Sequence, residues 1–417
     1  MNTPTLGQTR FDSKLTHTIS EDVRIPERIE VGAEPGLQFE LAGPRAKLFF
    51  DPKKTRAGIV TCGGLCPGLN NVIRSLFLEL HYGYGVSEVL GFRGGYGGLD
   101  PKCGVEPVKI TPQFVDRIHQ EGGTILGTSR GPVDIQRAVD NLIARKIDIL
   151  FTIGGDGTQR GANDLYQLAR KRGHALSVVG VPKTIDNDVG FVSRTFGFFS
   201  AVEEAKRVLD CAHTEARSVQ GGIGLVKLMG RHAGFITAGA VVASQDVNFA
   251  LIPEVPFKLD IFLGALKQRM LNKSHAVIAV AEGAGQDLLA ADTSKRDPSG
   301  NVKLKDVGPF LREKIETFFK AEGIPVVVRY FDPSYEVRSR PANCEDALFC
   351  DLFARHAVHA AMAGKTGVVI GFLHERFIHV PTELLASHTK HTKRLDPASG
   401  WWRSVLATTG QPARFDR

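Results

Sequence analysis

Short apolar runs alternate with longer stretches of helical periodicity along most of the chain from Ala57 onward. The apolar runs are rich in β-branched residues, which is typical of parallel strands buried on both faces. Between them, apolar residues recur with helical spacing, for example over residues 134–145, 163–172 and 201–212. Strands that alternate with helices in this way predict a doubly wound α/β fold with mostly parallel sheets.

The chain of 417 residues is long enough for more than one domain. We expect two doubly wound domains whose sheets face each other across a cleft, with less regular segments at both ends. Trp401 and Trp402 in the basic tail are predicted to be packing or interface anchors. The expected parts are an arm over residues 1–55, a first α/β domain over 56–200 with 343–385, a second, smaller one over 201–342, and a tail over 386–417 that packs on the outside.

A glycine turn with an acid follows the apolar run at residues 147–153. Its sequence is Gly154-Gly155-Asp156-Gly157-Thr158. Adjacent glycines let backbone N–H groups approach phosphate oxygens closely, and an acid beside them can hold a cation directly or through water. The segment therefore predicts a phosphate and magnesium site. The alternative is that the glycines only turn the chain into a helix, as they do in many doubly wound sheets.

A second polar segment, Pro182-Lys183-Thr184-Ile185-Asp186-Asn187-Asp188, follows the β-branched run at 177–181. The carboxyl edge of a parallel sheet is where open α/β folds bind ligands, so a lysine and two acids are expected beside the glycine turn. Either acid taken alone could instead cap the following helix.

A third strand, residues 56–61, runs into a turn that contains Gly63, Gly64 and Gly68, and a helix begins near Val72. The N-terminus of a helix favours anionic groups through its free N–H groups and its dipole. Two phosphate-binding turns in one chain suggest a donor with several phosphates.

Four ordered segments together resemble the 6-phosphofructokinase family, especially its longer plant and trypanosomatid-type ATP-dependent members. The resemblance extends over about residues 56–385, and it depends on the order of the motifs more than on any one of them. The segments are residues 57–74, 154–158, 182–188 and Gly224-Leu225-Val226-Lys227-Leu228-Met229-Gly230-Arg231.

The resemblance implies a phosphoryl transfer from ATP to the 1-hydroxyl of fructose 6-phosphate, with Asp186 as the catalytic base. Asp156 would position Mg²⁺, and Arg130 and Arg231 would spread positive charge over the phosphoryl group in transit. Thr184 would stand beside the base in the catalytic set. The residues implied for the donor are Gly64, Arg130, Gly131, Gly155, Asp156, Gly157, Thr158 and Lys183.

On the acceptor side, the resemblance implies that Glu282, after the apolar strand at 275–281, binds sugar hydroxyls. Tyr335 stands where bacterial relatives carry a histidine. One departure is Gly222, which occupies the position from which a neighbouring bacterial subunit supplies an arginine; Arg217 or Lys227 could compensate. The residues implied for fructose 6-phosphate are Thr184, Ile185, Asp186, Met229, Gly230, Arg231, Glu282, Arg329, Tyr335, Glu336, Val337 and Arg338.

The family contains both ATP and pyrophosphate users, and two positions bear on the donor. Pyrophosphate users carry aspartate at the position of Gly157, where a carboxylate would crowd and repel the α-phosphate of a nucleotide. Lys183 resembles the lysine of pyrophosphate users, but plant and trypanosomatid-type ATP enzymes combine it with the same glycine. We therefore expect ATP, with the pyrophosphate-dependent enzyme as the alternative and a catalytically silent phosphosugar sensor as a remote one.

Composition narrows the remaining classes. The net charge of +7 could steer anionic substrates or attract nucleic acid, but no nucleic-acid motif accompanies it. Six cysteines without metal-ligand clustering are expected to be reduced thiols. No apolar run approaches membrane-spanning length, so we expect a cytoplasmic protein, and the resemblance implies a homodimer or homotetramer.

Overall fold

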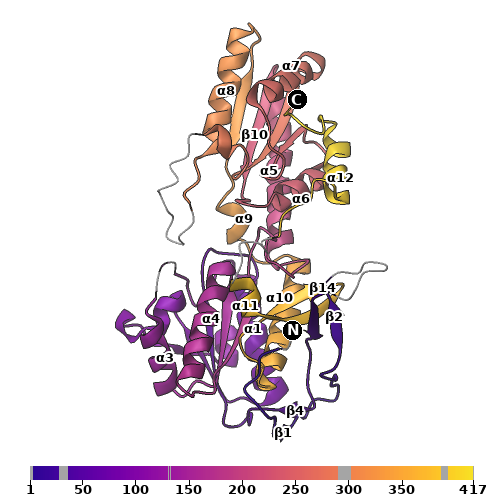
Figure 1. Ribbon diagram of the computed structural model, residues 1–417. Coiled ribbons are helices and arrows are strands. Elements are labelled where there is room, and N and C mark those ends of the chain that lie inside the picture. The colour runs from indigo at the N-terminus through magenta and orange to yellow at the C-terminus, as the bar shows by residue number, and fades with distance from the viewer. Residues whose placement is uncertain are drawn as a thin grey trace. The chain divides into compact units, whose positions relative to one another are not determined.

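The computed structural model describes the chain except for residues 1–2, 28–35, 130, 132, 290–301, 387–392 and 417. The chain divides into two compact units, each of which is described by itself (Figure 1). The first unit contains Met1–Thr184, Val189–Gly197 and Ser339–Thr392, and the second contains Ile185–Asp188, Phe198–Arg338 and Lys393–Arg417. The donor and sugar roles expected for the two domains stay predictions.

The first unit is built on a nine-stranded sheet of order β2-β3-β15-β14-β9-β8-β5-β6-β7. Its five central strands, from β14 to β6, are parallel, whereas the strands at both edges are antiparallel. The expected doubly wound fold is confirmed, with a mixed sheet at its margins. The strands are β2 (Arg24–Pro26), β3 (Gln38–Leu41), β5 (Arg56–Thr61), β6 (Glu88–Phe92), β7 (Val108–Lys109), β8 (Ile149–Gly154), β9 (Ser177–Pro182), β14 (Val368–Leu373) and β15 (Arg376–Pro381).

Helices cover both faces of this sheet. On one face α3 (Ile135–Ala144) and α4 (Asp156–Lys171) enclose a cluster in which alternate strand residues such as Leu150 are fully buried. On the other face α10 (Cys344–Met362) packs against α1 (Leu69–Leu78) and against β9 and β14. Helix α4 begins seven residues before the predicted stretch at 163–172, because the glycine turn is itself the start of the helix. The short helices are α2 (Pro112–Val115), the π-helix at Glu79–Tyr84 and α11 (Thr382–Ala386), and 3-10 turns lie at Gly95–Leu99, Pro101–Cys103 and Ile118–Gln120.

The N-terminal arm is integrated into the first unit rather than laid over it. Strands β2 and β3 extend the sheet beside β15, and β1 (Phe11–Asp12) pairs with β4 (Lys47–Leu48). Glu40 on β3 is buried, and its carboxylate lies 2.8 Å from Arg45 and 3.0 Å from Lys365. The two cations compensate the buried carboxylate, and Lys365 ties the arm to the segment between α10 and β14. The lack of periodicity in residues 1–55 concealed these strands, since each is only two to four residues long.

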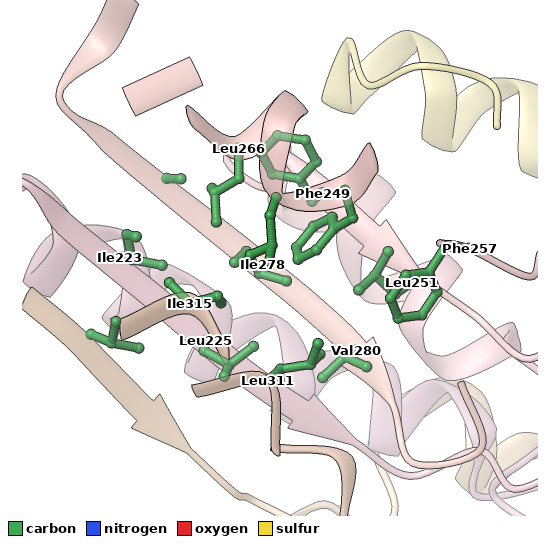
Figure 2. Close-up of a cluster of buried hydrophobic side chains, with 14 of the residues drawn as sticks. Ile223, Leu225, Phe249, Leu251, Phe257, Leu266, Ile278, Val280, Leu311 and Ile315 are labelled. Atoms are coloured by element: carbon green, nitrogen blue, oxygen red, sulfur yellow. The ribbon is translucent and has the colours of Figure 1, made fainter. Parts of the chain in front are cut away.

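The second unit contains a four-stranded, fully parallel sheet of order β11-β12-β10-β13. These strands are β10 (Gly222–Leu228), β11 (Phe249–Leu251), β12 (His275–Ala281) and β13 (Val327–Phe331). On one face lie α5 (Phe198–Arg217), α6 (Phe235–Ser244) and α12 (Gly400–Thr409). On the other lie α7 (Leu259–Lys273) and α8 (Val307–Ala321), while α9 (Glu336–Ser339) and a 3-10 turn at Gln286–Leu288 follow strand ends. Figure 2 shows the core that α7 and α8 enclose, with Leu225, Ile278 and Val280 of the sheet facing Leu266, Leu311 and Ile315 of the helices.

The C-terminal tail contributes to this core. Phe415 is 1% exposed and packs with Phe249 and Phe262, and its carbonyl accepts a hydrogen bond from the Lys258 N–H at 2.7 Å. Trp402 is also buried, in agreement with the predicted packing role. The basic tail was expected to pack on the outside, and its large apolar residues Trp402 and Phe415 fill interior positions of the second unit.

All six cysteines are free thiols, as predicted. Burial raises the pKa of Cys62, beside the first glycine turn, to about 12. Burial thus disfavours the thiolate form of Cys62, which suits a packing residue. Within the described residues, no helix is long and apolar enough to cross a membrane.

We predict that Phe415→Ala destabilises the second unit by about 3–5 kcal/mol, because it opens a cavity among buried aromatic rings. Urea unfolding monitored by tryptophan fluorescence measures the loss. Arg414→Ala, which removes a largely exposed neighbour, is the matched control. Equal unfolding free energies for the two variants would contradict the core role of Phe415.

Candidate active site

Two glycine turns lie side by side at the carboxyl edge of the first sheet. Strands β5 and β8 are parallel neighbours, and their ends are in register, with Thr61 opposite Ile153. After β5 the chain crosses to β6 on one side, whereas β8, β9 and β14 follow on the other. The direction of winding therefore reverses between β5 and β8, and such a switch point leaves a crevice where α/β folds bind ligands.

The turn after β8 is the N-terminus of α4. Gly155 is its N-cap, and Asp156, Gly157 and Thr158 form the first helical turn. The positive end of the helix dipole therefore lies at the predicted phosphate site. A Cβ atom at Gly154 would come within 2.1 Å of the Thr158 hydroxyl, so close packing requires that glycine. At Gly157 the nearest atom to a Cβ would be 3.7 Å away, which is ordinary contact, and the fold itself does not require glycine there.

Lys183 connects the two turns. Its backbone N–H donates to the Gly154 carbonyl at 3.1 Å, and its ammonium donates to the Gly64 carbonyl at 2.5 Å. The side chain is buried, with 6% of the residue exposed. The structure thus brings together Gly64, Lys183 and the turn at residues 154–158, all of which were predicted on the donor side.

The segment around residue 129 contacts the glycine turn that follows β5. The Gly63 N–H donates to the Ser129 carbonyl at 3.2 Å, and the Thr128 hydroxyl donates to the Gly63 carbonyl at 2.7 Å. Gly131 has a φ of 115°, a conformation that favours glycine. Arg130 lies outside the described residues, so its role on the donor phosphates stays a prediction.

The acid-rich loop is divided between the two units. Thr184 belongs to the first unit, where its carbonyl accepts a hydrogen bond from the Thr195 hydroxyl at 2.8 Å. Ile185–Asp188 belongs to the second unit, where the Asp188 carbonyl accepts a hydrogen bond from the Lys393 N–H at 2.8 Å. The expected proximity of Asp186 to Asp156 stays a prediction.

Most acceptor residues follow strand ends of the second sheet. Residues 229–231 follow β10, Glu282 follows β12, and the segment with Tyr335 and Arg338 comes after β13. The Glu282 N–H donates to the Leu228 carbonyl at 2.8 Å, which joins the first two strand ends. A Cβ atom at Gly283 would lie 2.0 Å from the Arg231 carbonyl, so this junction leaves no room for a side chain.

The carboxyl group of Glu282 lies in a buried, charged environment. Burial raises its pKa, and the positive charges of Arg231 and Lys227 oppose that rise. Arg231 donates a hydrogen bond to the Val302 carbonyl at 2.5 Å, and Arg338 stacks over the Tyr335 ring at 4.8 Å from its centroid. A carboxyl group between cations at a strand end can accept hydrogen bonds from sugar hydroxyls while the cations attract a phosphate.

Lys227 and two aspartates for which the sequence predicted no role complete this environment. The Lys227 ammonium lies 2.7 Å from Asp332, which follows β13, and 3.2 Å from Asp306, the N-cap of α8. Burial alone would lower the pKa of Lys227, but the hydrogen bond to Asp332 and the neighbouring charges outweigh burial and raise it. The lysine is thus bound by two acids of its own unit, which speaks against its use as a substitute for the missing arginine. The position of Asp332 directly after a strand was the sequence signal that could have identified it.

Gly222 and Arg329, two other positions considered for the sugar phosphate, do not follow the end of a strand. A Cβ atom at Gly222 would lie 2.1 Å from the Ala216 carbonyl, so the departure from the bacterial arginine follows from close packing of β10 on α5. Arg329 lies within β13 rather than at its end, paired with Gly224, and its half-exposed side chain is 3.8 Å from Glu215. Its predicted contact with the sugar phosphate stays a prediction.

The fold and these strand-end groups define a two-unit α/β protein with glycine turns of the kind that bind phosphate. A family profile described as Phosphofructokinase matches residues 56–361. The chain is 45% identical to the "ATP-dependent 6-phosphofructokinase" of Amycolatopsis methanolica, over 98% of this chain and 94% of the relative. It is 47% identical to the protein of that name from Trypanosoma brucei brucei, over 89% and 76% of the two chains, respectively. The chain belongs to the phosphofructokinase family, and the resemblance found in its motifs is confirmed.

Solved structures support the same fold. The pyrophosphate-dependent phosphofructokinase of Marinobacter aquaeolei superimposes with a TM-score of 0.70, covering 85% of this chain and 91% of that chain at 21% identity. The T-state structure of Pichia pastoris phosphofructokinase gives a TM-score of 0.65 at 22% identity, covering 86% of this chain and 39% of that one. At these identities the likeness establishes the fold alone.

We predict that Lys227→Met destabilises the second unit by about 1–3 kcal/mol, because Asp332 and Asp306 lose their shared cation but keep part of their solvent contact. Thermal unfolding of the variant measures the loss. The exposed Lys303→Met is the control for removal of a lysine charge from the same region. An unchanged melting temperature would show that the lysine does not hold the two acids.

Proposed function

We propose that the protein is an ATP-dependent 6-phosphofructokinase, which transfers the γ-phosphoryl group of ATP to the 1-hydroxyl of fructose 6-phosphate. The products are fructose 1,6-bisphosphate and ADP. The observation that carries the proposal is the match to relatives named ATP-dependent 6-phosphofructokinase, at 42–47% identity in bacterial, plant and trypanosomatid proteins. The glycine turns of the first unit and the charged strand ends of the second supply groups that suit such a reaction.

In the proposed reaction Asp186 accepts the proton of the 1-hydroxyl as that oxygen forms a bond to the γ-phosphorus. The bond between this phosphorus and the β–γ bridging oxygen breaks, and the bridging oxygen leaves with ADP. Arg231 and Arg130 would balance the charge of the phosphoryl group in transit, and Thr184 would orient the acceptor. The N-terminus of α4 and Lys183 would hold the remaining donor phosphates.

Magnesium fits the donor side in our proposal. When bound, Mg²⁺ neutralises the β- and γ-phosphate oxygens. It usually takes one or two carboxylates and completes its shell with substrate phosphates and water. Asp156 at the start of α4 would be the protein ligand. No group of three or more His, Cys, Asp or Glu with metal-site geometry occurs in the described part of the chain.

Gly157 favours ATP over pyrophosphate. Since the fold tolerates a Cβ atom at this position, the absence of a side chain is better explained by the space that a nucleotide needs. Burial of Glu282 and the nearby cations suit fructose 6-phosphate as acceptor. A homodimer or homotetramer and a cytoplasmic location belong to the same proposal, on the resemblance alone.

We predict that Asp186→Asn lowers kcat by about 10²–10⁴-fold, because the amide cannot accept the proton of the 1-hydroxyl. Binding of fructose 6-phosphate, measured by calorimetry, should largely survive. The exposed Asp116→Asn is the control for loss of a carboxylate in general. Retained turnover in Asp186→Asn would remove the proposed base.

We predict that Gly157→Asp lowers kcat/KM for ATP by about 10–10²-fold, because like charges ~4 Å apart repel by 1–4 kcal/mol. The variant should unfold at the wild-type temperature, since nothing in the fold opposes a side chain there. Gly264→Asp in α7, another open glycine, is the control. The wild type and both variants are each assayed with ATP and with pyrophosphate at equal concentration. A wild-type preference for pyrophosphate would favour the alternative donor, and a wild type inactive with either would favour the silent sensor.

A further inference from the structure

The C-terminal tail begins its described path in the second unit with three residues, 393–395, that we call the strap. The Lys393 N–H donates to the Asp188 carbonyl at 2.8 Å. This hydrogen bond holds the end of the Ile185–Asp188 loop, which contains the proposed base Asp186. The loop includes no helix or strand that would fix it through its own backbone pairing.

The loop has a backbone conformation that needs support. Asn187, between the two acids, has a φ of 54° and is 5% exposed. Left-handed backbone costs free energy in any residue other than glycine, although asparagine tolerates it better than most. A neighbour that fixes Asp188 therefore also helps to fix the direction of the side chain at residue 186.

The strap also holds a second substrate segment through Glu254. The Leu395 N–H donates to the Glu254 carboxylate at 2.8 Å, and the Gly234 N–H donates to both oxygens of the same group at 3.0 and 3.1 Å. Gly234 ends the segment that contains residues 229–231 and caps α6. A Cβ atom there would lie 3.0 Å from Glu254 and 2.5 Å from Ile252, so the carboxylate and the backbone are closely packed.

Burial shifts the pKa values of two ionisable side chains, Glu254 beside the strap and Lys393 within it. Burial raises the pKa of Glu254, and the N–H groups of Gly234 and Leu395 oppose the rise. Burial lowers the pKa of Lys393 to about 7, and the charge of Asp188 opposes the fall. The Lys393 ammonium lies 5.1 Å from the centroid of the Phe235 ring, in the first residue of α6. Both side chains thus contact residues at the place where the strap meets the start of α6.

The rest of the tail anchors the strap. Helix α12 packs on α6, and the Trp401 ring lies 6.3 Å from Phe235 and 6.2 Å from Phe198. Leu395 is 2% exposed, and Phe415 is part of the core of the unit. Buried residues within and after the strap therefore tie its functional contacts to the core of the second unit.

We propose that the strap is a positioning element for catalysis, which fixes the loop of Asp186 through the Lys393 N–H and the segment of Arg231 through Glu254. The proposal rests on the proposed function for the roles of Asp186 and Arg231. It assigns to the tail, which lies far from both segments in the sequence, an effect on turnover in addition to stability.

The first experiment compares Lys393→Pro with Lys393→Met in the full chain. Proline removes the N–H that Asp188 accepts, whereas methionine removes only the ammonium group. We expect Lys393→Pro to lose about 10²-fold in kcat, with a much smaller change in KM for fructose 6-phosphate, because the base is misplaced but the sugar site is retained. Lys393→Met should lose much less kcat. Equal losses in the two variants would contradict a role for the N–H group.

The second experiment uses Glu254→Ala and Glu254→Gln. Alanine frees both N–H donors and should raise KM and lower kcat, whereas glutamine keeps one acceptor oxygen and should restore part of both. The exposed Arg403→Ala on α12 is the control for tail substitutions. If Lys393→Pro does not fold, this pair decides: wild-type kcat and KM in a folded Glu254→Ala protein would overturn the proposal.

Amide hydrogen exchange separates this proposal from the proposed function. Lys393→Pro should speed exchange in residues 185–189, and Glu254→Ala should speed it in residues 229–235, with or without turnover. A wild type that is inactive with both donors would refute the proposed function, while unchanged exchange in both variants would refute the strap.

Discussion

Parallel strand pairing is the constraint on which the functional residues of both units depend. Parallel neighbours end at the same edge of a sheet, so segments far apart in the chain become adjacent when they follow such strands. In the first unit this brings the turn after β5 next to the turn after β8, and Lys183 after β9 spans both. In the second unit it joins the segment after β10 to Glu282 after β12 through a backbone hydrogen bond. Neither unit needs a long loop to assemble these groups.

Close packing then decides which residue types these edges accept. Gly154 and Gly283 are glycines because a Cβ atom would collide with the Thr158 side chain or with the Arg231 carbonyl. Gly157 is different, since its surroundings in the protein would admit a side chain. A glycine that the fold does not require is more informative about a ligand than one that it does, and this distinction is invisible in the sequence. A glycine-rich turn alone is therefore weak support for phosphate binding, because packing alone can require its glycines. The position of the turn at a helix N-terminus is stronger support.

The positions of functional residues at strand ends could be predicted from the sequence, whereas the interactions that support them could not. The apolar runs gave β8, β9 and β12 and placed Asp156, Lys183 and Glu282 at their ends. The short strands of the arm lack a periodic pattern, and the interior position of Phe415 depends on tertiary packing. Lys227 was considered as a replacement for an arginine, but the acids that bind it lie 79 and 105 residues away in sequence. The role of Glu254 was equally hidden, because a single acid between two prolines after a short strand resembles an exposed turn residue.

The tail shows how one segment can couple stability to chemistry. Its buried residues contribute to the core of the second unit, and its strap forms backbone hydrogen bonds to a loop and, through Glu254, to a second segment. The hydrogen bonds of the strap come from backbone N–H groups, which any residue except proline supplies, so a sequence comparison would register little of them. Because a base contributes to catalysis only when its carboxylate is correctly placed, the loss of one such hydrogen bond can affect turnover more than folding. The tail is therefore part of the structural support of the acid-rich loop, as is strand β9, which precedes that loop.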